Sequence, residues 1–92
     1  MGLRVISQSS RNVTIAGHRT SIRLEREMWH AVDEICRREG LSLSELCTRI
    51  ERDRGGRDGR TSAIRVYALA YFRDAATEAG HEKVGHGRSR HG

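Results

Sequence analysis

The sequence predicts a mainly α-helical chain in which one short N-terminal strand precedes two helices and a third, C-terminal helix. Apolar and polar residues first alternate, so that Ile22 and Leu24 share one face of an extended segment, and the opposite face carries Arg19, Ser21 and Arg23. Directly after this segment the apolar period becomes helical. The chain has 92 residues, of which 36% are hydrophobic, and this small apolar content favours association with a second copy.

The strand is expected to pair antiparallel across a homodimer. A strand without a neighbour leaves its backbone groups unpaired, and pairing with the same strand of a second copy is the simplest remedy. Residues 1–11 are expected to form a flexible arm. The β-prone run Val13, Thr14 and Ile15 follows, and Gly17 marks either a tight turn between two short strands or a bulge in one long strand.

Two amphipathic helices complete a predicted ribbon and helix domain of residues 12–54. Gly40 is placed to end the first helix. Ser42 and Glu45 have the spacing of a capping box, in which the serine side chain bonds the amide three residues on and the glutamate reaches back. The dimer core is expected to contain apolar residues of the strand and both helices, namely Ile22, Leu24, Met28, Val32, Ile35, Cys36, Leu46, Cys47 and Ile50.

A third helix is predicted over residues 61–79, after a glycine-rich charged linker of residues 55–60. Thr61 or Ser62 is expected to cap it. It would either extend the dimer core or offer a surface to a protein partner. Residues 80–92 have almost nothing apolar to bury and are expected to form a disordered basic tail.

The charge pattern indicates a polyanionic partner. The formal net charge is +5. Residues 1–24 contain four arginines and no acidic residue, whereas residues 25–54 contain six arginines and eight acidic residues. The positive charge is therefore concentrated at the strand and, with Lys83, Arg88 and Arg90, at the tail.

The sequence argues against an enzyme, a cofactor-binding protein and a membrane protein. It contains no acid pair, no nucleophile with a base and no phosphate-binding glycine loop. Cys36 and Cys47 lack the spacing of a zinc or redox site and are expected to be core residues, so neither a metal nor a cofactor is predicted. No apolar run has the length of a membrane span or a signal peptide, which predicts a cytoplasmic protein.

A two-stranded ribbon that carries these arginines suits double-stranded DNA. Such a ribbon fits the major groove, where arginine can bond to both O6 and N7 of guanine. The run TSIRLEREMWHAVDEICRREGLSLSELCTRI resembles a ribbon-helix-helix domain of the Arc/MetJ type, over residues 19–54. The wider stretch from VTIAGHRTSIRLE to TSAIRVYALAYFR is similar to a short bacterial ribbon-helix-helix family that adds a C-terminal helix.

The resemblance implies a nucleoid-associated homodimer that binds double-stranded DNA as a transcriptional repressor or antitoxin, and in this family dimers often pair into tetramers on DNA. Its base-contacting positions carry over onto Arg19, Ser21 and Arg23. The amino end of the second helix holds a phosphate in this family, which implies that role for Ser42, Leu43 and Ser44.

The chain departs from the resemblance at the phosphate-binding turn. Many members carry lysine or arginine there, whereas Leu41, Leu43 and Glu45 surround the turn in this chain, and the helical pair is net negative. The alternative to a sequence-specific regulator is therefore a dimeric protein-interaction adaptor, or an antitoxin whose linker and third helix engage a toxin.

Overall fold

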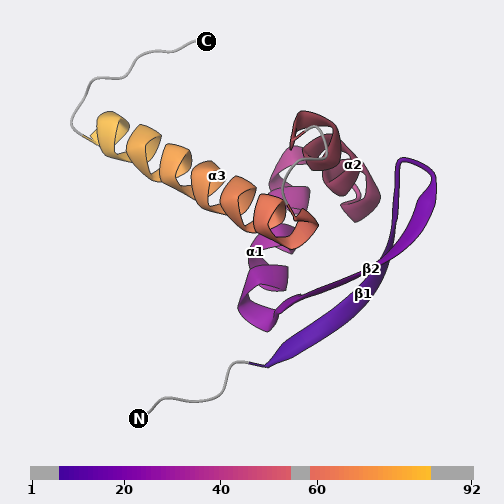
Figure 1. Ribbon diagram of the computed structural model, residues 1–92. Helices are drawn as coiled ribbons and strands as arrows, with labels where there is room; N and C mark the ends of the chain where they lie inside the picture. The colour runs from indigo at the N-terminus through magenta and orange to yellow at the C-terminus, as the bar shows by residue number, and fades with distance from the viewer. Residues whose placement is uncertain (1–6, 55–58, 84–92) are drawn as a thin grey trace.

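The computed structural model describes residues 7–54 and 59–83 and contains a hairpin followed by three helices (Figure 1). The predicted fold class is confirmed, because a two-stranded antiparallel ribbon precedes the helices in ribbon-helix-helix order. The elements are β1 (Gln8–Ile15), β2 (His18–Glu25), α1 (Arg26–Glu39), α2 (Leu43–Arg54) and α3 (Arg60–Lys83).

The hairpin differs from the prediction in the number of strands, because β1 of the same chain is a neighbour of β2. All of β2 is paired with β1 of the same chain, from Gln8 opposite Glu25 to Ile15 opposite His18. Ala16 and Gly17 form the turn, with φ angles of 50° and 86°. Positive φ at both central residues gives a turn whose twist matches that of the two strands. Of the two alternatives at Gly17, the chain adopts the tight turn, and β1 of the same chain lies along one edge of β2.

Residues 8–11 belong to β1, although the sequence predicted a flexible arm there. Side chains of α1 anchor this polar segment. The indole N–H of Trp29 donates to the carbonyl oxygen of Ser9 at 2.9 Å, and Arg11 donates to both carboxylate oxygens of Asp33 at 2.9 and 3.0 Å. The Arg11 guanidinium also lies 4.4 Å from the centre of the Trp29 ring, which is cation–π distance. These contacts order the strand up to Gln8, and residues 1–6 of the predicted arm lie outside the described residues.

The apolar core is complete within one chain. Alternate hairpin residues point at the helices, and Trp29 is only 2% exposed. The buried cluster consists of Val13, Ile15, Ile22, Leu24, Trp29, Val32, Ile35, Leu46, Cys47, Ile50, Ile64 and Ala68, with Met28 and Cys36 partly buried against it. The residues predicted for the dimer core are thus buried or partly buried within the single chain, where residues of β1 and α3 pack with them.

The predicted connection between α1 and α2 is confirmed. Gly40 ends α1 in the left-handed conformation, with φ of 67°, and its N–H donates to the carbonyl of Cys36. The capping box is also present. The backbone N–H of Ser42 donates to Glu45 Oε1 at 2.8 Å, and the backbone N–H of Glu45 donates to Ser42 Oγ at 3.0 Å.

The third helix is longer at both ends than the predicted span of residues 61–79. Its first turn closes through the N–H of Ala63, which donates to the carbonyl of Gly59 at 3.0 Å, so Thr61 and Ser62 lie inside the helix. The helix also continues through Gly80, since one helical glycine costs only about 1 kcal/mol. Residues 55–58 of the predicted linker and 84–92 of the predicted tail lie outside the described residues.

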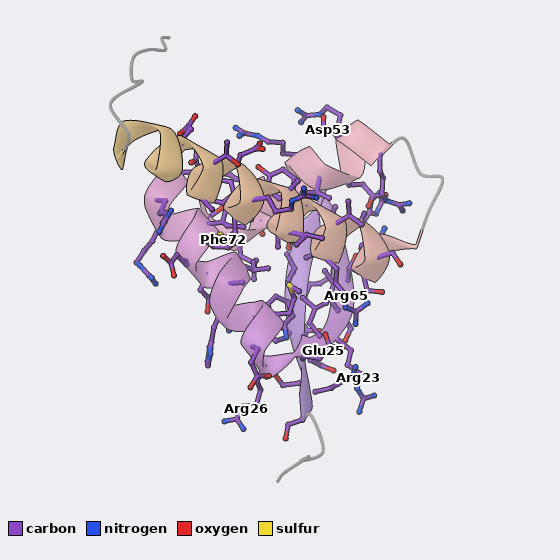
Figure 2. All side chains as sticks on the ribbon, turned by 90° about the vertical axis from the view of Figure 1, so that its left-hand side faces the viewer. Arg23, Glu25, Arg26, Asp53, Arg65 and Phe72 are labelled. Carbon is purple, nitrogen blue, oxygen red and sulfur yellow. The ribbon has the colours of Figure 1, made fainter. Side chains whose placement is uncertain are left out.

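The first half of α3 crosses α1 and α2, and its second half extends beyond the other elements (Figure 1). Arg65 pairs with Glu25 at the end of β2, with an N–O distance of 3.0 Å, and the two side chains face each other in Figure 2. The hydroxyl of Tyr71 donates to Glu39 of α1 at 2.6 Å. These contacts attach α3 to both the hairpin and α1.

Candidate nucleic-acid interface

One face of the hairpin is entirely polar and turned away from the core. Its members, called the outer ribbon face below, are all exposed and comprise Ser10, Asn12, Thr14, Arg19, Ser21 and Arg23. In the strand register Arg23 lies opposite Ser10, Ser21 opposite Asn12, and Arg19 opposite Thr14. Figure 2 shows Arg23 pointing away from the helices. The three predicted base-contacting residues therefore share one solvent-facing surface.

The hairpin arginines divide into two kinds. Arg11 lies on the core face, where its guanidinium bonds Asp33, and this hydrogen bond holds the pKa of the Asp33 carboxyl below its usual value. Among the described residues, neither Arg19 nor Arg23 forms an ion pair with a carboxylate. Arg11 is thus part of the internal bonding of the fold, whereas Arg19 and Arg23 lie on the exposed face.

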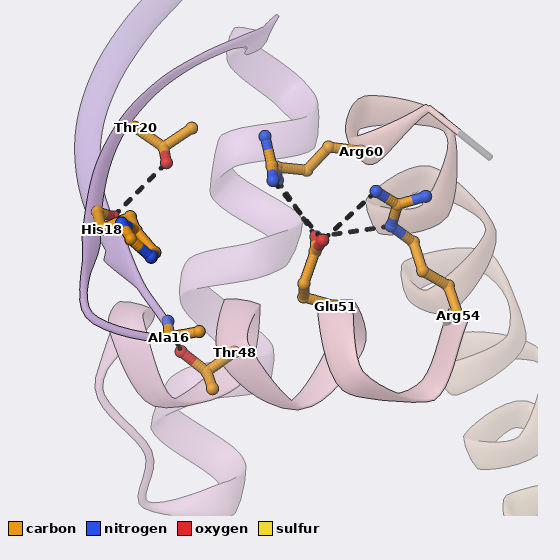
Figure 3. Close-up of polar contacts among 7 residues, drawn as sticks. All are labelled: Ala16, His18, Thr20, Thr48, Glu51, Arg54 and Arg60. Carbon is orange, nitrogen blue, oxygen red and sulfur yellow. Dashed lines mark hydrogen bonds and ion pairs between the residues drawn. The ribbon is translucent and has the colours of Figure 1, made fainter. Parts of the chain in front are cut away.

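Carboxylates of the protein itself engage the arginines at the α2–α3 junction. Figure 3 shows Arg54 and Arg60 converging on Glu51, with N–O distances of 3.3 and 3.1 Å. These hydrogen bonds hold the pKa of Glu51 below its usual value, and the one from Arg60 has the largest effect. Arg54 and Arg60 therefore stabilise the junction, and Glu51 balances one of their two positive charges.

The amino end of α2 places the predicted phosphate-binding residues beside a carboxylate. Ser42 is engaged on both sides by the capping box, through its hydroxyl and its own backbone N–H. The backbone N–H groups of Leu43 and Ser44 point out of the first turn, where the helix provides no acceptor for them. An anion here would use those two amides, but it would also meet the negative charge of Glu45.

A groove of about 490 Å³ separates the hairpin turn from α2 and brings two further arginines close to that helix end. It is called the tip groove below, and it is lined by Thr14, Ala16, Gly17, Leu41, Ser44, Glu45, Thr48, Arg49 and Arg52. Two of its lining residues are hydrogen-bonded, because the backbone N–H of Ala16 donates to Thr48 Oγ1 at 3.1 Å (Figure 3). The groove therefore joins the outer ribbon face, through Thr14, to the start of α2.

Arg49 and Arg52 are the functional candidates that reasoning from the sequence missed. The sequence suggested that the turn before α2 has no basic residue nearby. In the structure both arginines lie further along α2, on the face that also carries Ser44 and Glu45. The spacing of four residues from 45 to 49 and of three residues from 49 to 52 could have indicated this shared helix face.

Other kinds of site have less support in the described part of the chain. Among the side chains that the structure describes, in residues 7–54 and 59–78, there is no cluster of three or more histidine, cysteine or acidic side chains that could hold a metal ion. Burial raises the pKa of the Cys47 thiol to about 11, so the nucleophilic thiolate is scarce at neutral pH. The same residues include no helix with the length and apolar character needed to cross a bilayer.

A polar two-stranded ribbon in front of a capped helix pair defines the ribbon-helix-helix class. The chain belongs to the ribbon-helix-helix family, whose model, described as "Ribbon-helix-helix domain", matches residues 8–72. Members of this family are generally DNA-binding transcription regulators or antitoxins, are typically not enzymes, and typically bind DNA as dimers.

A solved structure gives the same fold. The chain is similar to an uncharacterized protein from Bordetella pertussis Tohama I, with 32% sequence identity and a TM-score of 0.66 over 78% of this chain. The match spans 61% of the length of the Bordetella protein chain. No curated protein matches the sequence.

Proposed function

We propose that the protein is a sequence-specific DNA-binding transcriptional regulator that inserts its hairpin into the major groove and acts as a homodimer in the bacterial cytoplasm. The observation that carries this proposal is the outer ribbon face. Arg19 and Arg23 are exposed there without a carboxylate partner among the described residues, and every other side chain of the face is small and polar. The major groove accommodates a two-stranded ribbon of this kind.

The spacing of the two arginines suggests how they would divide the DNA contacts. Arg19 and Arg23 are four residues apart, which is about 13 Å along a strand that rises about 3.3 Å per residue. Bases on one strand are about 3.4 Å apart, so the two arginines would reach positions about four steps apart. Ser21 and Asn12 lie between them as a cross-strand pair. Asparagine can bond to both N6 and N7 of adenine, which makes Asn12 a further candidate reader.

The tip groove would hold the DNA backbone next to the ribbon. The amides of Leu43 and Ser44 supply donors at the start of α2, and Arg49 and Arg52 supply positive charge that offsets Glu45. Contacts of this kind fix the register of the protein on the duplex and carry no sequence information. The expected division is therefore base reading by the hairpin and phosphate binding by α2.

A protein-interaction adaptor or an antitoxin remains the second candidate function, and α3 is the observation that favours it. Val66 and Leu69 are 65% and 61% exposed on this helix. Exposed apolar side chains that lie next to each other are typical of an interaction surface. Such a protein would use α3 for its partner, whether or not the ribbon contacts DNA.

Selection of bound sequences from a random double-stranded DNA pool tests the proposal. The selected site is then used in binding assays with Arg19→Ala, Arg23→Ala and the control Arg37→Ala, which removes an exposed arginine of α1. Loss of site preference with either ribbon variant but not with Arg37→Ala supports the proposal. If no sequence is enriched, or if both ribbon variants keep affinity and preference, the ribbon is not the DNA reader and the adaptor function is favoured.

A further inference from the structure

A groove between the end of α2 and the first half of α3 combines an apolar wall with an arginine. This groove, called the α3 groove below, has a volume of about 350 Å³. That volume is at the small end of the range for pockets that hold small molecules, which is about 300–1,000 Å³. The apolar part of the lining consists of Ile50, Ala63, Val66, Tyr67 and Ala70, and the polar part of Asp53, Arg54 and Ser62.

Arg54 is a lining residue whose hydrogen bonding is incomplete. Its Nε and Nη2 donate to the Glu51 carboxylate at 3.4 and 3.3 Å, which is longer than the usual range of about 2.7–3.2 Å. Its Nη1 is buried and has no hydrogen-bond partner among the described residues. Figure 3 shows the two bonded nitrogens toward Glu51 and the remaining nitrogen on the other side of the guanidinium. A buried donor without an acceptor costs free energy, so Arg54 would gain from an additional anion.

Glu51 stays paired even when Arg54 turns away from it. Arg60 donates to the same carboxylate, from Nε at 3.1 Å and from Nη2 at 3.4 Å. Two guanidinium groups thus share one carboxylate, and one positive charge of the three side chains is left unbalanced. Rotation of the Arg54 guanidinium toward the α3 groove would expose Nη1 to a ligand, while Arg60 continues to balance Glu51.

We propose that the α3 groove binds a small monocarboxylic acid, whose apolar body lies against Ile50, Val66 and Tyr67 and whose carboxylate bonds the Arg54 guanidinium. Arginine suits this ligand because its forked N–H groups match the two oxygens of a carboxylate. The apolar body would also cover Val66, which is 65% exposed. Asp53 lines the same groove and would repel a second carboxylate, which favours a monoacid over a diacid. The site lies outside the proposed DNA-binding surface and does not depend on the proposed function.

The first experiment compares four eight-carbon molecules by calorimetric titration of the full chain, with amide NMR shifts to locate the site. Octanoate has the proposed chemistry, 1-octanol lacks the charge, octylammonium reverses it, and octanedioate adds a second carboxylate. We expect octanoate to shift amides of α2 and α3 and to bind at least about tenfold more tightly than the other three, since only it pairs one carboxylate with Arg54. If octanoate does not bind there, or if 1-octanol or octylammonium binds as tightly, the proposal is overturned.

The second experiment changes the groove and repeats the titration. Arg54→Met keeps the apolar stem of the side chain and removes its donors, so octanoate should bind at least about tenfold more weakly while 1-octanol is unaffected. Arg73→Met is the matched control, because it removes an exposed arginine of α3 that does not line the groove. This control should bind octanoate like the wild type.

A third variant keeps the test decisive if Arg54→Met disturbs the α2–α3 junction. Ala70→Trp places a large side chain in the groove from an exposed position, so the fold should tolerate it, and binding of both octanoate and 1-octanol should be lost. Circular dichroism should show the same helix content for Ala70→Trp, Arg73→Met and the wild type. Octanoate affinity that survives in Ala70→Trp, or in a folded Arg54→Met, overturns the proposal. These titrations contain no DNA, so their outcome is independent of whether the ribbon reads a sequence.

Discussion

At the scale of single residues, the three hairpin arginines show how position decides the role of one residue type. Arg11 bonds Asp33 and lies over Trp29, and its contribution is to hold β1 against α1. Arg19 and Arg23 lie on the other face, where solvent or a ligand supplies their partners. Side chains alternate between two faces along each strand, and the hairpin register places Arg11 of β1 opposite the buried Ile22, so Arg11 lies on the core face while Arg19 and Arg23 of β2 lie on the outer face.

Arg23→Ala should weaken binding to the selected DNA site by about 1–3 kcal/mol and relax base preference at one position of the site. The free energy of unfolding should change by less than about 0.5 kcal/mol, because the side chain is exposed. Titration of the selected site and of single-base variants measures both effects. Arg19→Ala should act at a position about four steps away, and the same shift in preference for both variants would contradict the proposed spacing.

Ala16→Asn should stabilise the protein by about 0.5–1 kcal/mol. Ala16 has a φ of 50°, a region that costs an ordinary L-residue roughly 1–2 kcal/mol and that asparagine tolerates better. The variant would create an Asn-Gly pair, which two-residue hairpin turns prefer. Urea unfolding followed by circular dichroism measures the change. Ala16→Val is the matched opposite, since a β-branched residue fits positive φ poorly, and equal midpoints for both variants would show that the turn is not strained.

At the scale of elements, the start of α2 combines a structural role with the proposed phosphate contact. The capping box engages Ser42 and Glu45 with each other, so Ser42 acts first as a cap. Phosphate binding is proposed for the Leu43 and Ser44 amides together with Arg49 and Arg52. The two roles can be separated by experiment, because they belong to different atoms of the same helix.

Ser42→Ala should lower the free energy of unfolding by about 1 kcal/mol, the usual cost of a lost cap. Its effect on DNA binding should be small and equal for all sequences. Arg49→Ala and Arg52→Ala, tested as separate variants, should each weaken binding to every DNA sequence. Each should also flatten the salt dependence of binding by about one unit per lost phosphate contact, with little change in stability. Salt titrations of DNA binding and urea unfolding measure these quantities. An unchanged salt dependence in both arginine variants would remove α2 from the interface.

At the scale of the whole molecule, a small number of polar contacts attach the hairpin and α3 to the helix pair. Arg11 bonds Asp33 between β1 and α1, and Arg65 bonds Glu25 between α3 and β2. The hydrogen bond from Arg11 holds the pKa of the Asp33 carboxyl below its usual value. The pKa of the Glu25 carboxyl is also lowered, first by a hydrogen bond from the backbone N–H of Glu25 and then by those from Arg65. A carboxyl with a lowered pKa in the folded state stabilises the protein at neutral pH, and this stabilisation is lost as the pH falls below the ordinary value.

Asp33→Asn should therefore destabilise the protein at pH 7 and have less effect at low pH. The ordinary pKa for this group is 3.8, so the wild-type advantage should begin to decrease near that pH and continue to decrease as the pH falls through the lowered pKa of the folded state. The side chains of the pair are 38% and 40% exposed, and solvent screening limits the effect at pH 7 to about 1 kcal/mol. Urea unfolding of both proteins from neutral pH down to pH values below the ordinary pKa measures it. A constant difference across this range would assign the effect to the hydrogen bond and not to the charge.

Much of the local structure could be predicted because it depends on neighbouring residues. Ile22 and Leu24 were expected on the apolar face of the strand, and the structure buries both. Gly40 and the Ser42–Glu45 box were expected at a helix end and a helix start, and both are present with the predicted bonds. Each of these features is specified by spacings of two to four residues, which the sequence displays directly.

Long-range features were not predictable in the same way. The polar segment 8–11 is a strand only because it pairs with β2 and is held by Trp29 and Asp33, which lie 20 and 22 residues away from their partners. Arg49 and Arg52 join the candidate site only because the hairpin turn packs beside α2. No pattern among neighbouring residues of the sequence predicts either contact.

By itself, the sequence determined the helical segments, their ends next to the α1–α2 connection, the apolar face of the strand and the position of Arg19, Ser21 and Arg23 on the opposite face. Only the tertiary structure decided that β1 of the same chain pairs with β2, and that residues of β1 and α3 join the buried core. The physical reason is the cost of bringing segments together. A turn of two residues keeps β1 permanently beside β2 at a small loss of chain entropy, whereas a second copy must be recruited from solution. The apolar period and the capping residues of a sequence describe single segments. The cost of bringing two segments together depends on how the whole chain connects them.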